Sequence, residues 1–126
     1  SNLQKESVQN LENENDQKLK GVYINSKYVN GKIVNDLVYV DESTKERKTI
    51  LTQKEINEKF EFTLDDEHTI NLAESAIIGN EIYVTLDYGV HYSQEDMGWR
   101  YAYKRQKTVC FKYNTDTKEI TELYKF

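Results

Sequence analysis

The dipeptide Asn30-Gly31 constrains the fold of this chain more than any other feature, because it predicts a β-hairpin of fixed register. A two-residue type I′ turn needs positive φ at both central residues, and Asn-Gly tolerates that conformation best. With these residues as the loop, four cross-strand pairs share one face: Tyr28 with Ile33, Ser26 with Asn35, Ile24 with Leu37 and Val22 with Tyr39. The one polar pair is matched to itself, so we predict that this otherwise apolar face is buried.

Two further turns extend the same logic. Gly79-Asn80 is a second two-residue turn, which places Ile77 opposite Ile82 and Ala73 opposite Leu86. A third hairpin closes at Met97-Gly98 and pairs Leu86 with Val109, Val84 with Phe111 and Ile82 with Tyr113. Carried outward, this register pairs Tyr92 with Tyr103, Asp96 with Trp99 and Glu95 with Arg100. The alternative is an irregular loop from Gly89 to Gly98.

A short helix is expected between the first two hairpins, near residues 53–59. Thr52 and Glu55 have the spacing of a capping box, and Leu51 and Ile56 stand where a hydrophobic staple packs. Residues 60–64 then alternate with period two, which predicts a strand. Residues 65–68 form a polar turn, and the last strand, 119–126, follows a turn at 114–118.

These elements predict a mainly β fold, in which an antiparallel hairpin meander forms a sandwich, an open barrel or a curved sheet. The length of 126 residues is typical of one domain, which we assign to residues 21–126. Residues 1–20 carry few aliphatic side chains and are expected to be a polar tether or a marginal helix. The alternative is an α+β fold in which an N-terminal helix docks on the sheet.

A weak internal repeat links residues 40–46 with residues 113–119, because each segment ends a strand and continues into Thr-Lys-Glu. Hairpin turns alone are enough to produce such a repeat. The second copy, with residues 81–86 before it, resembles in general pattern the inner strands of a β-propeller blade. Two such units cannot close a propeller, which needs at least about four blades, so no family is assigned.

Charge and composition exclude several classes of function. The chain has 17 basic and 22 acidic residues, and its net charge of -5 repels phosphate backbones, so nucleic-acid binding is not expected. No apolar run approaches the roughly 18 residues of a membrane-spanning helix. The single cysteine, Cys110, cannot form an internal disulfide or a thiolate zinc site.

The location of the protein rests on weaker signals. Lysine outnumbers arginine fourteen to three and asparagine is frequent, a usage typical of AT-rich bacterial genomes. A polar segment such as residues 3–20 is typical of the start of an exported protein or lipoprotein, with a lipid anchor upstream of the visible chain. A frayed terminus of a cytoplasmic protein is the alternative.

Catalytic and metal sites are not predicted. A nucleophilic triad needs a base, and the only histidines, His68 and His91, have no serine in an elbow motif to act on. The densest cluster of hard metal ligands, residues 65–68, is interpreted as a solvated turn. We therefore assign no catalytic residue, no metal and no cofactor, although two of the 22 acidic residues could meet as a glycosidase pair.

The segment 88–103 is the richest in residues that recognise ligands. Its candidate binding residues are Tyr92, Trp99, Arg100, Tyr101 and Tyr103. Flat aromatic rings beside charges stack on sugars or anchor a peptide at low entropic cost. We therefore expect a binding or interaction module for a protein or glycan. The alternatives are that these rings only pack a core, that the chain is a small hydrolase-like enzyme, or that it is an acidic immunity or inhibitor protein.

Overall fold

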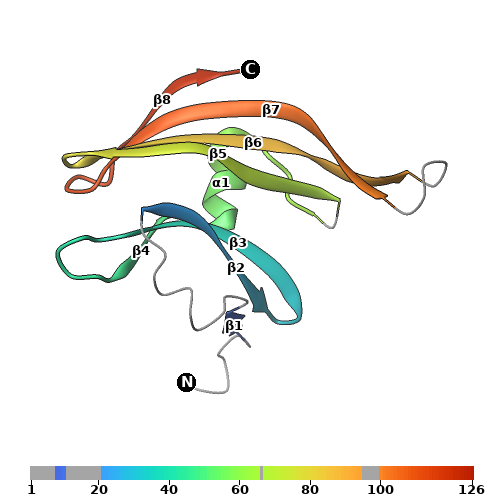
Figure 1. Ribbon diagram of the computed structural model, residues 1–126, viewed down its shortest axis with the longest axis horizontal. Helices are drawn as coiled ribbons and strands as arrows, with labels where there is room; N and C mark the ends of the chain where they lie inside the picture. Colours follow the sequence, from blue (N-terminus) through green and yellow to red (C-terminus); the bar gives the residue numbers. More distant parts are fainter. Residues whose placement is uncertain (1–7, 11–20, 66, 95–99) are drawn as a thin grey trace. The chain divides into compact units, whose positions relative to one another are not determined.

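Figure 1 shows the computed structural model, which describes residues 8–10, 21–65, 67–94 and 100–126; the side chains of residues 8–10, 92–94 and 100–102 lie outside the description. The described chain is mainly β (66% strand), with two antiparallel sheets, one short helix and no closed barrel, so the predicted fold class is confirmed. The elements are β1 (Val8–Asn10), β2 (Val22–Val29), β3 (Lys32–Val40), β4 (Arg47–Leu51), α1 (Gln53–Phe60), β5 (His68–Ile78), β6 (Glu81–Gln94), β7 (Arg100–Asn114) and β8 (Ile120–Lys125).

The strands form two sheets of four, each in sequence order: β1-β2-β3-β4 and β5-β6-β7-β8. The chain correspondingly divides into two compact units, residues 1–54 and 55–126. That residues 21–126 form a single domain stays a prediction. Most of the segment predicted as a tether lies outside the described residues, but residues 8–10 form a strand that pairs with β2. Among the described residues no helix is long and apolar enough to cross a membrane.

The Asn30-Gly31 hairpin forms with the predicted register. Asn30 and Gly31 have φ of 53° and 82°, and all four predicted pairs between β2 and β3 are present. The Ser26 hydroxyl also donates a hydrogen bond to Asn35 Oδ1. The prediction of a wholly buried face is wrong at the turn end, where Tyr28 and Ile33 are 38% and 51% exposed. Turn geometry sets the register, whereas burial depends on what covers the face.

The opposite face of this hairpin buries a polar network that holds the start of α1. The buried carboxylate of Asp36 pairs with Lys27 Nζ at 2.9 Å and accepts a hydrogen bond from the Gln53 backbone N–H, also at 2.9 Å. Gln53 Oε1 in turn accepts from the Asn35 backbone N–H at 2.7 Å. A carboxylate at a helix N-terminus is favourable because the first N–H groups have no partner within the helix. The sequence predicted this helix, but not its anchor on β3.

The predicted strand over residues 60–64 is wrong, because this segment is the C-terminal cap of α1. Glu61 adopts a left-handed conformation with φ of 58°, and the Phe62 N–H donates to the Asn57 carbonyl at 3.2 Å. This is the Schellman arrangement, in which a left-handed residue ends a helix. It places both Phe60 and Phe62 in buried positions. The cap therefore produced the period-two pattern that we interpreted as a strand.

The β5–β6 and β6–β7 hairpins follow the predicted register apart from one β-bulge in each. Ile77 pairs with Ile82, and the three predicted apolar pairs between β6 and β7 are all present. Leu72, not Ala73, lies opposite Leu86, because a bulge at Ala73 shifts the register of β5. The buried side chains of this sheet are Ile70, Ile82, Val84, Leu86, Tyr88, Thr108, Val109, Phe111 and Tyr113. Most belong to the face that carries Phe111, whose ring stacks on Phe60 of α1.

The internal repeat is a recurring hairpin loop. Asp41 Oδ1 accepts hydrogen bonds from the backbone N–H groups of Ser43 and Thr44, and Asn114 Oδ1 accepts from those of Asp116 and Thr117. The following residues, Lys45 and Lys118, both adopt positive φ, at 61° and 65°. Hairpin turns alone therefore explain the repeat, and Asn114 acts in turn chemistry, as predicted.

The shared geometry of the two loops predicts how substitutions of Asp41 affect stability. We expect Asp41→Ala to lower the melting temperature, because the Ser43 and Thr44 N–H groups lose their acceptor. Asp41→Asn should be tolerated much better, since an asparagine already fills this place in the second loop. Hydrogen bonds from Ser43 and Lys48 lower the pKa of Asp41. The charged loop is thus favoured above the unfolded pKa and loses this advantage as pH falls. Thermal denaturation at pH 7 and pH 3 measures the effect of each substitution and of the Asp41 charge. If Asp41→Ala and Asp41→Asn lowered the melting temperature equally, the role of Asp41 as the loop acceptor would be refuted.

Gly31 allows a simpler test of the first hairpin. A Cβ at Gly31 would meet nothing within 4 Å, so only its φ of 82° opposes substitution. We expect Gly31→Val to cost about 1 kcal/mol or more of unfolding free energy, because left-handed conformations are strained for β-branched residues. Urea denaturation measures the change, and an unchanged stability would contradict the turn assignment.

Candidate functional site

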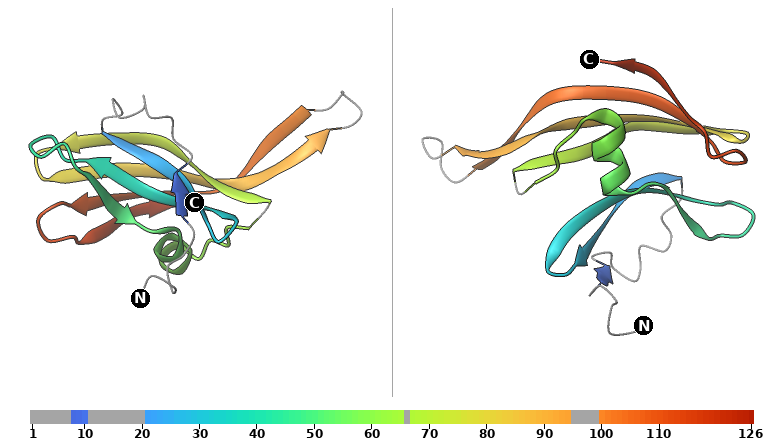
Figure 2. Two further views of the ribbon diagram at one scale, coloured as in Figure 1. Left: turned by 90° about the horizontal axis from the view of Figure 1, so that it is seen from below. Right: turned by 180° about the vertical axis from the view of Figure 1, so that it is seen from behind.

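The candidate site is the arm formed by the far ends of β6 and β7. The pairing of β5 with β6 ends at His68 and Val90, and that of β8 with β7 ends at Val109. Beyond these points, residues 91–94 of β6 pair only with residues 100–103 of β7 among the described strands. Figure 2 shows this two-stranded arm projecting from the sheet. The strand pairing of the long hairpin is therefore confirmed up to Gln94 and Arg100, and the alternative of an irregular loop starting at Gly89 is wrong.

The register within the arm differs from the prediction by one residue. A bulge between Tyr88 and Gly89 leaves Gln106 of β7 without an opposite residue. Tyr103 therefore faces His91, Tyr92 faces Ala102, and Arg100 faces Gln94. The predicted pairs Tyr92–Tyr103 and Glu95–Arg100 are wrong for this reason. The predicted pair Asp96–Trp99 lies outside the described residues, as does the Met97-Gly98 turn.

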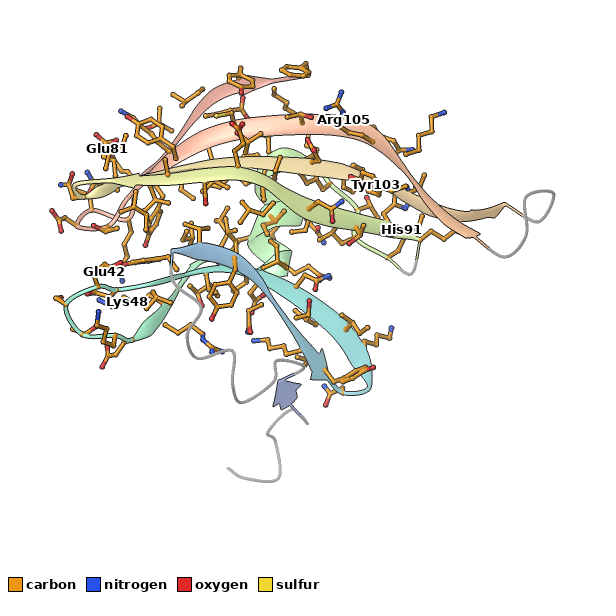
Figure 3. All side chains as sticks on the ribbon, viewed as in Figure 1. Glu42, Lys48, Glu81, His91, Tyr103 and Arg105 are labelled. Atoms are coloured by element: carbon orange, nitrogen blue, oxygen red, sulfur yellow. The ribbon has the colours of Figure 1, made fainter. Side chains whose placement is uncertain are left out.

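Gly89 makes this bulge possible because Tyr103 and the backbone of β7 occupy the space of a side chain. A Cβ at Gly89 would lie 2.2 Å from the Lys104 carbonyl oxygen and 2.8 Å from Tyr103 Cζ. The Tyr103 ring also contacts His91, with ring centroids 5.3 Å apart. Figure 3 labels His91, Tyr103 and Arg105 at the base of the arm. An aromatic ring that covers a strand glycine is a known way to hold a bent sheet.

Tyr103 is the best-described of the predicted binding residues. Its side chain is half-buried, and its hydroxyl oxygen is buried without a hydrogen bond of standard geometry to the described residues. Burial and the nearby charge of Asp87 raise the pKa of Tyr103, while Arg105 and the Asn71 side chain oppose the shift. The hydroxyl therefore stays protonated at neutral pH.

The other predicted binding residues are placed only by their backbone. Tyr92, Arg100 and Tyr101 lie within β6 and β7, and Tyr101 faces Ser93. Tyr101 and Tyr103 are two residues apart on one strand and so occupy positions on the same face. Trp99 lies outside the described residues. By backbone register, Tyr101 and Tyr103 occupy same-face positions of β7, whereas Tyr92 belongs to the alternate set of positions.

The neighbouring Tyr88 has a packing role. It is buried, its ring stacks on Phe62 with centroids 4.5 Å apart, and its hydroxyl donates to the Thr63 carbonyl at 2.8 Å. His68 also stacks on the Tyr88 ring, with centroids 5.4 Å apart. The aromatic-rich segment therefore divides at Gly89 into a core part and an arm.

The histidines occupy two different environments. His68 Nδ1 lies 2.8 Å from Asp65 Oδ1, which also accepts from the His68 and Glu67 backbone N–H groups. These hydrogen bonds lower the pKa of Asp65, so the carboxylate stays charged and closes the turn. His91 is exposed beside Tyr103. Among the described residues, no group of three or more potential metal ligands is present.

One surface was missed by the sequence interpretation. Tyr124 and Phe126 at the end of the chain stack with centroids 5.5 Å apart and are 48% and 71% exposed. Contact with the Cys110 thiol, its pair across β7 and β8, raises the pKa of Tyr124. Their spacing of two in the last predicted strand was the available signal. It shows which residues share a face, but not whether another layer covers them.

Comparison with protein-family models, with curated proteins and with solved structures finds no match to this chain in any of the three.

The packing at the base of the arm predicts a large effect of Gly89→Ala. We expect a loss of about 2 kcal/mol or more in unfolding free energy, because the added Cβ collides with a backbone carbonyl that cannot move without the strand. Gly31→Ala is the control, since its Cβ meets open space and only its φ opposes it. Urea denaturation compares the two variants. Equal losses would show that Tyr103 and Lys104 do not enclose Gly89.

Proposed function

We propose that this chain is a binding module that recognises an extended, acidic segment of a partner protein through the β6–β7 arm. The observation that carries the proposal is the isolation of the arm. Residues 91–94 and 100–103 pair only with each other among the described strands, and the His91 N–H donates to the Glu67 carbonyl at the base of the arm. Each arm strand thus has an outer edge without a neighbouring strand. Such edges are the sites at which extended peptides add to a sheet.

The arm strand β7 is basic although the protein as a whole is acidic. Residues 100–107 include Arg100, Lys104, Arg105 and Lys107 and no acidic residue, against a net charge of -5 for the chain. Lys104 and Arg105 are exposed. A basic strand edge attracts a segment that carries carboxylates and repels basic ones, which sets both the association rate and the choice of partner.

Aromatic residues supply the remaining contact area. Tyr103 is held in place against Gly89 and His91, so little side-chain freedom is left for binding to remove. Tyr101 occupies the next position on the same face of β7. Tyrosine combines a flat apolar ring with a hydroxyl donor and is frequent at binding hot spots. No feature of the described residues gives comparable support to the alternative functions, a hydrolase-like enzyme or an acidic inhibitor.

The proposal is tested by binding to an array of extended peptides that alternate acidic and apolar residues, with a glycan array in parallel. We expect peptide capture that weakens with salt, and Tyr101→Ala and Arg105→Glu should each reduce affinity by at least about tenfold. Trp99→Ala is included because the sequence places this residue within the same segment. Tyr28→Ala and Lys32→Glu are matched controls on the other sheet, with the same chemical changes at exposed positions.

The melting temperatures distinguish binding from packing. Tyr101→Ala and Arg105→Glu should leave the melting temperature nearly unchanged. Capture of glycans but not peptides would replace the protein partner with a sugar. Peptide binding that the control variants weaken as much as the arm variants would refute the assignment to the arm.

A further inference from the structure

We propose that the outer half of β5, Glu74–Ile78, is a self-association edge that pairs with the same segment of a second copy of this chain. β5 is an edge strand of its sheet, and its only neighbour among the described strands is β6. All five residues of this segment are exposed, including Ile77 at 41% and Ile78 at 64%. An exposed apolar edge offers unpaired backbone groups and apolar side chains to an added strand.

This edge lacks the charged residues that the edge strands β4 and β8 carry. β4 has Arg47 and Lys48, and β8 has Glu122 and Lys125. Charged residues, lysine above all, oppose pairing because an added strand would bury them or place like charges together. The segment Glu74–Ile78 has no basic residue and a single charge, at Glu74. Of the three edge strands β4, β5 and β8, only β5 thus has a segment without this protection.

Two features limit and stiffen the segment. The bulge at Ala73 breaks the regular backbone of β5, so a continuous added strand can pair only beyond it. At the other end, the Asn80 side-chain amide donates to Asp116 Oδ2 at 3.0 Å, and the Asn80 backbone carbonyl accepts from the Thr115 N–H at 2.8 Å. The β5–β6 turn is therefore tied to the β7–β8 loop. A rigid edge loses little entropy when a strand adds to it.

A second copy fits this edge because the segment is complementary to itself in antiparallel pairing. In the register centred on Ala76, Ser75 faces the partner's Ile77 and Glu74 faces the partner's Ile78. The two Glu74 side chains are then separated by about 13 Å along the strands, which exceeds the Debye length of about 8 Å at physiological salt. Pairing about a two-fold axis uses the same edge on both copies, so it closes as a dimer and does not continue into a fibre.

The predicted dimer is weak, because each copy contributes a strand of five residues, about 17 Å long. Small interfaces of this kind are typical of transient complexes. Sedimentation equilibrium of the full chain from about 5 µM to about 500 µM should therefore show a rising dimer fraction. Amide hydrogen exchange at Glu74–Ile78 should slow as the concentration increases, because strand addition protects these backbone groups.

Ile77→Lys places a charge on the edge and is expected to weaken the dimer by at least about tenfold. Ile33→Lys is the matched control, since Ile33 is 51% exposed but lies in the other sheet, outside the proposed edge. A wild-type chain that stays monomeric throughout the series would overturn the proposal. A dimer that survives Ile77→Lys, or that Ile33→Lys disrupts equally, would overturn it as well. The peptide-capture variants lie on the arm, so the two proposals fail independently.

Discussion

The C-terminal cap of α1 is the constraint on which the second unit depends. The left-handed Glu61 turns the chain so that Phe60 stacks on Phe111 and Phe62 stacks on Tyr88. The carbonyls of the last turn, which have no partner within a helix, accept from lysines of the sheet: Phe60 from Lys125 at 3.1 Å and Glu61 from Lys107 at 3.5 Å. One turn of backbone thus joins the helix to three strands, β6, β7 and β8.

Lys107 connects this cap with the base of the arm. Its ammonium group lies 5.8 Å from the centre of the Tyr88 ring and 5.9 Å from that of the Phe62 ring. At these distances both rings attract the cation through cation–π interactions. The β-bulge at the base of the arm lies next to Lys107 in the sequence, at Gln106, opposite the step from Tyr88 to Gly89. The core therefore ends where the arm begins, and the arm can carry a recognition surface without adding a void or a polar group to the core.

The two proposed surfaces differ in chemistry and would therefore select different partners. The arm strand β7 is basic and aromatic and favours an acidic segment. The outer half of β5 is almost uncharged and favours a copy of itself. A basic edge opposes pairing with another basic edge, so the arm does not compete with β5 for self-association. A dimer through β5 would carry two arms and would raise the avidity for a partner with repeated acidic segments.

The sequence by itself determined the hairpins, because turn chemistry and period-two alternation are local. Asn30-Gly31 fixed every pair of the first hairpin, and the apolar pairs of β6 and β7 followed from the same rule. The bulges at Ala73 and Gln106 were decided by tertiary structure, since they depend on how a strand meets its neighbours, as Tyr103 meets Gly89. The cap at Glu61 was decided in the same way, because Phe60 and Phe62 alternate in a strand and in a Schellman turn alike. Exposure at Ile33 and Ile78 was also decided by tertiary structure, because a strand pattern records which residues share a face and not what covers it.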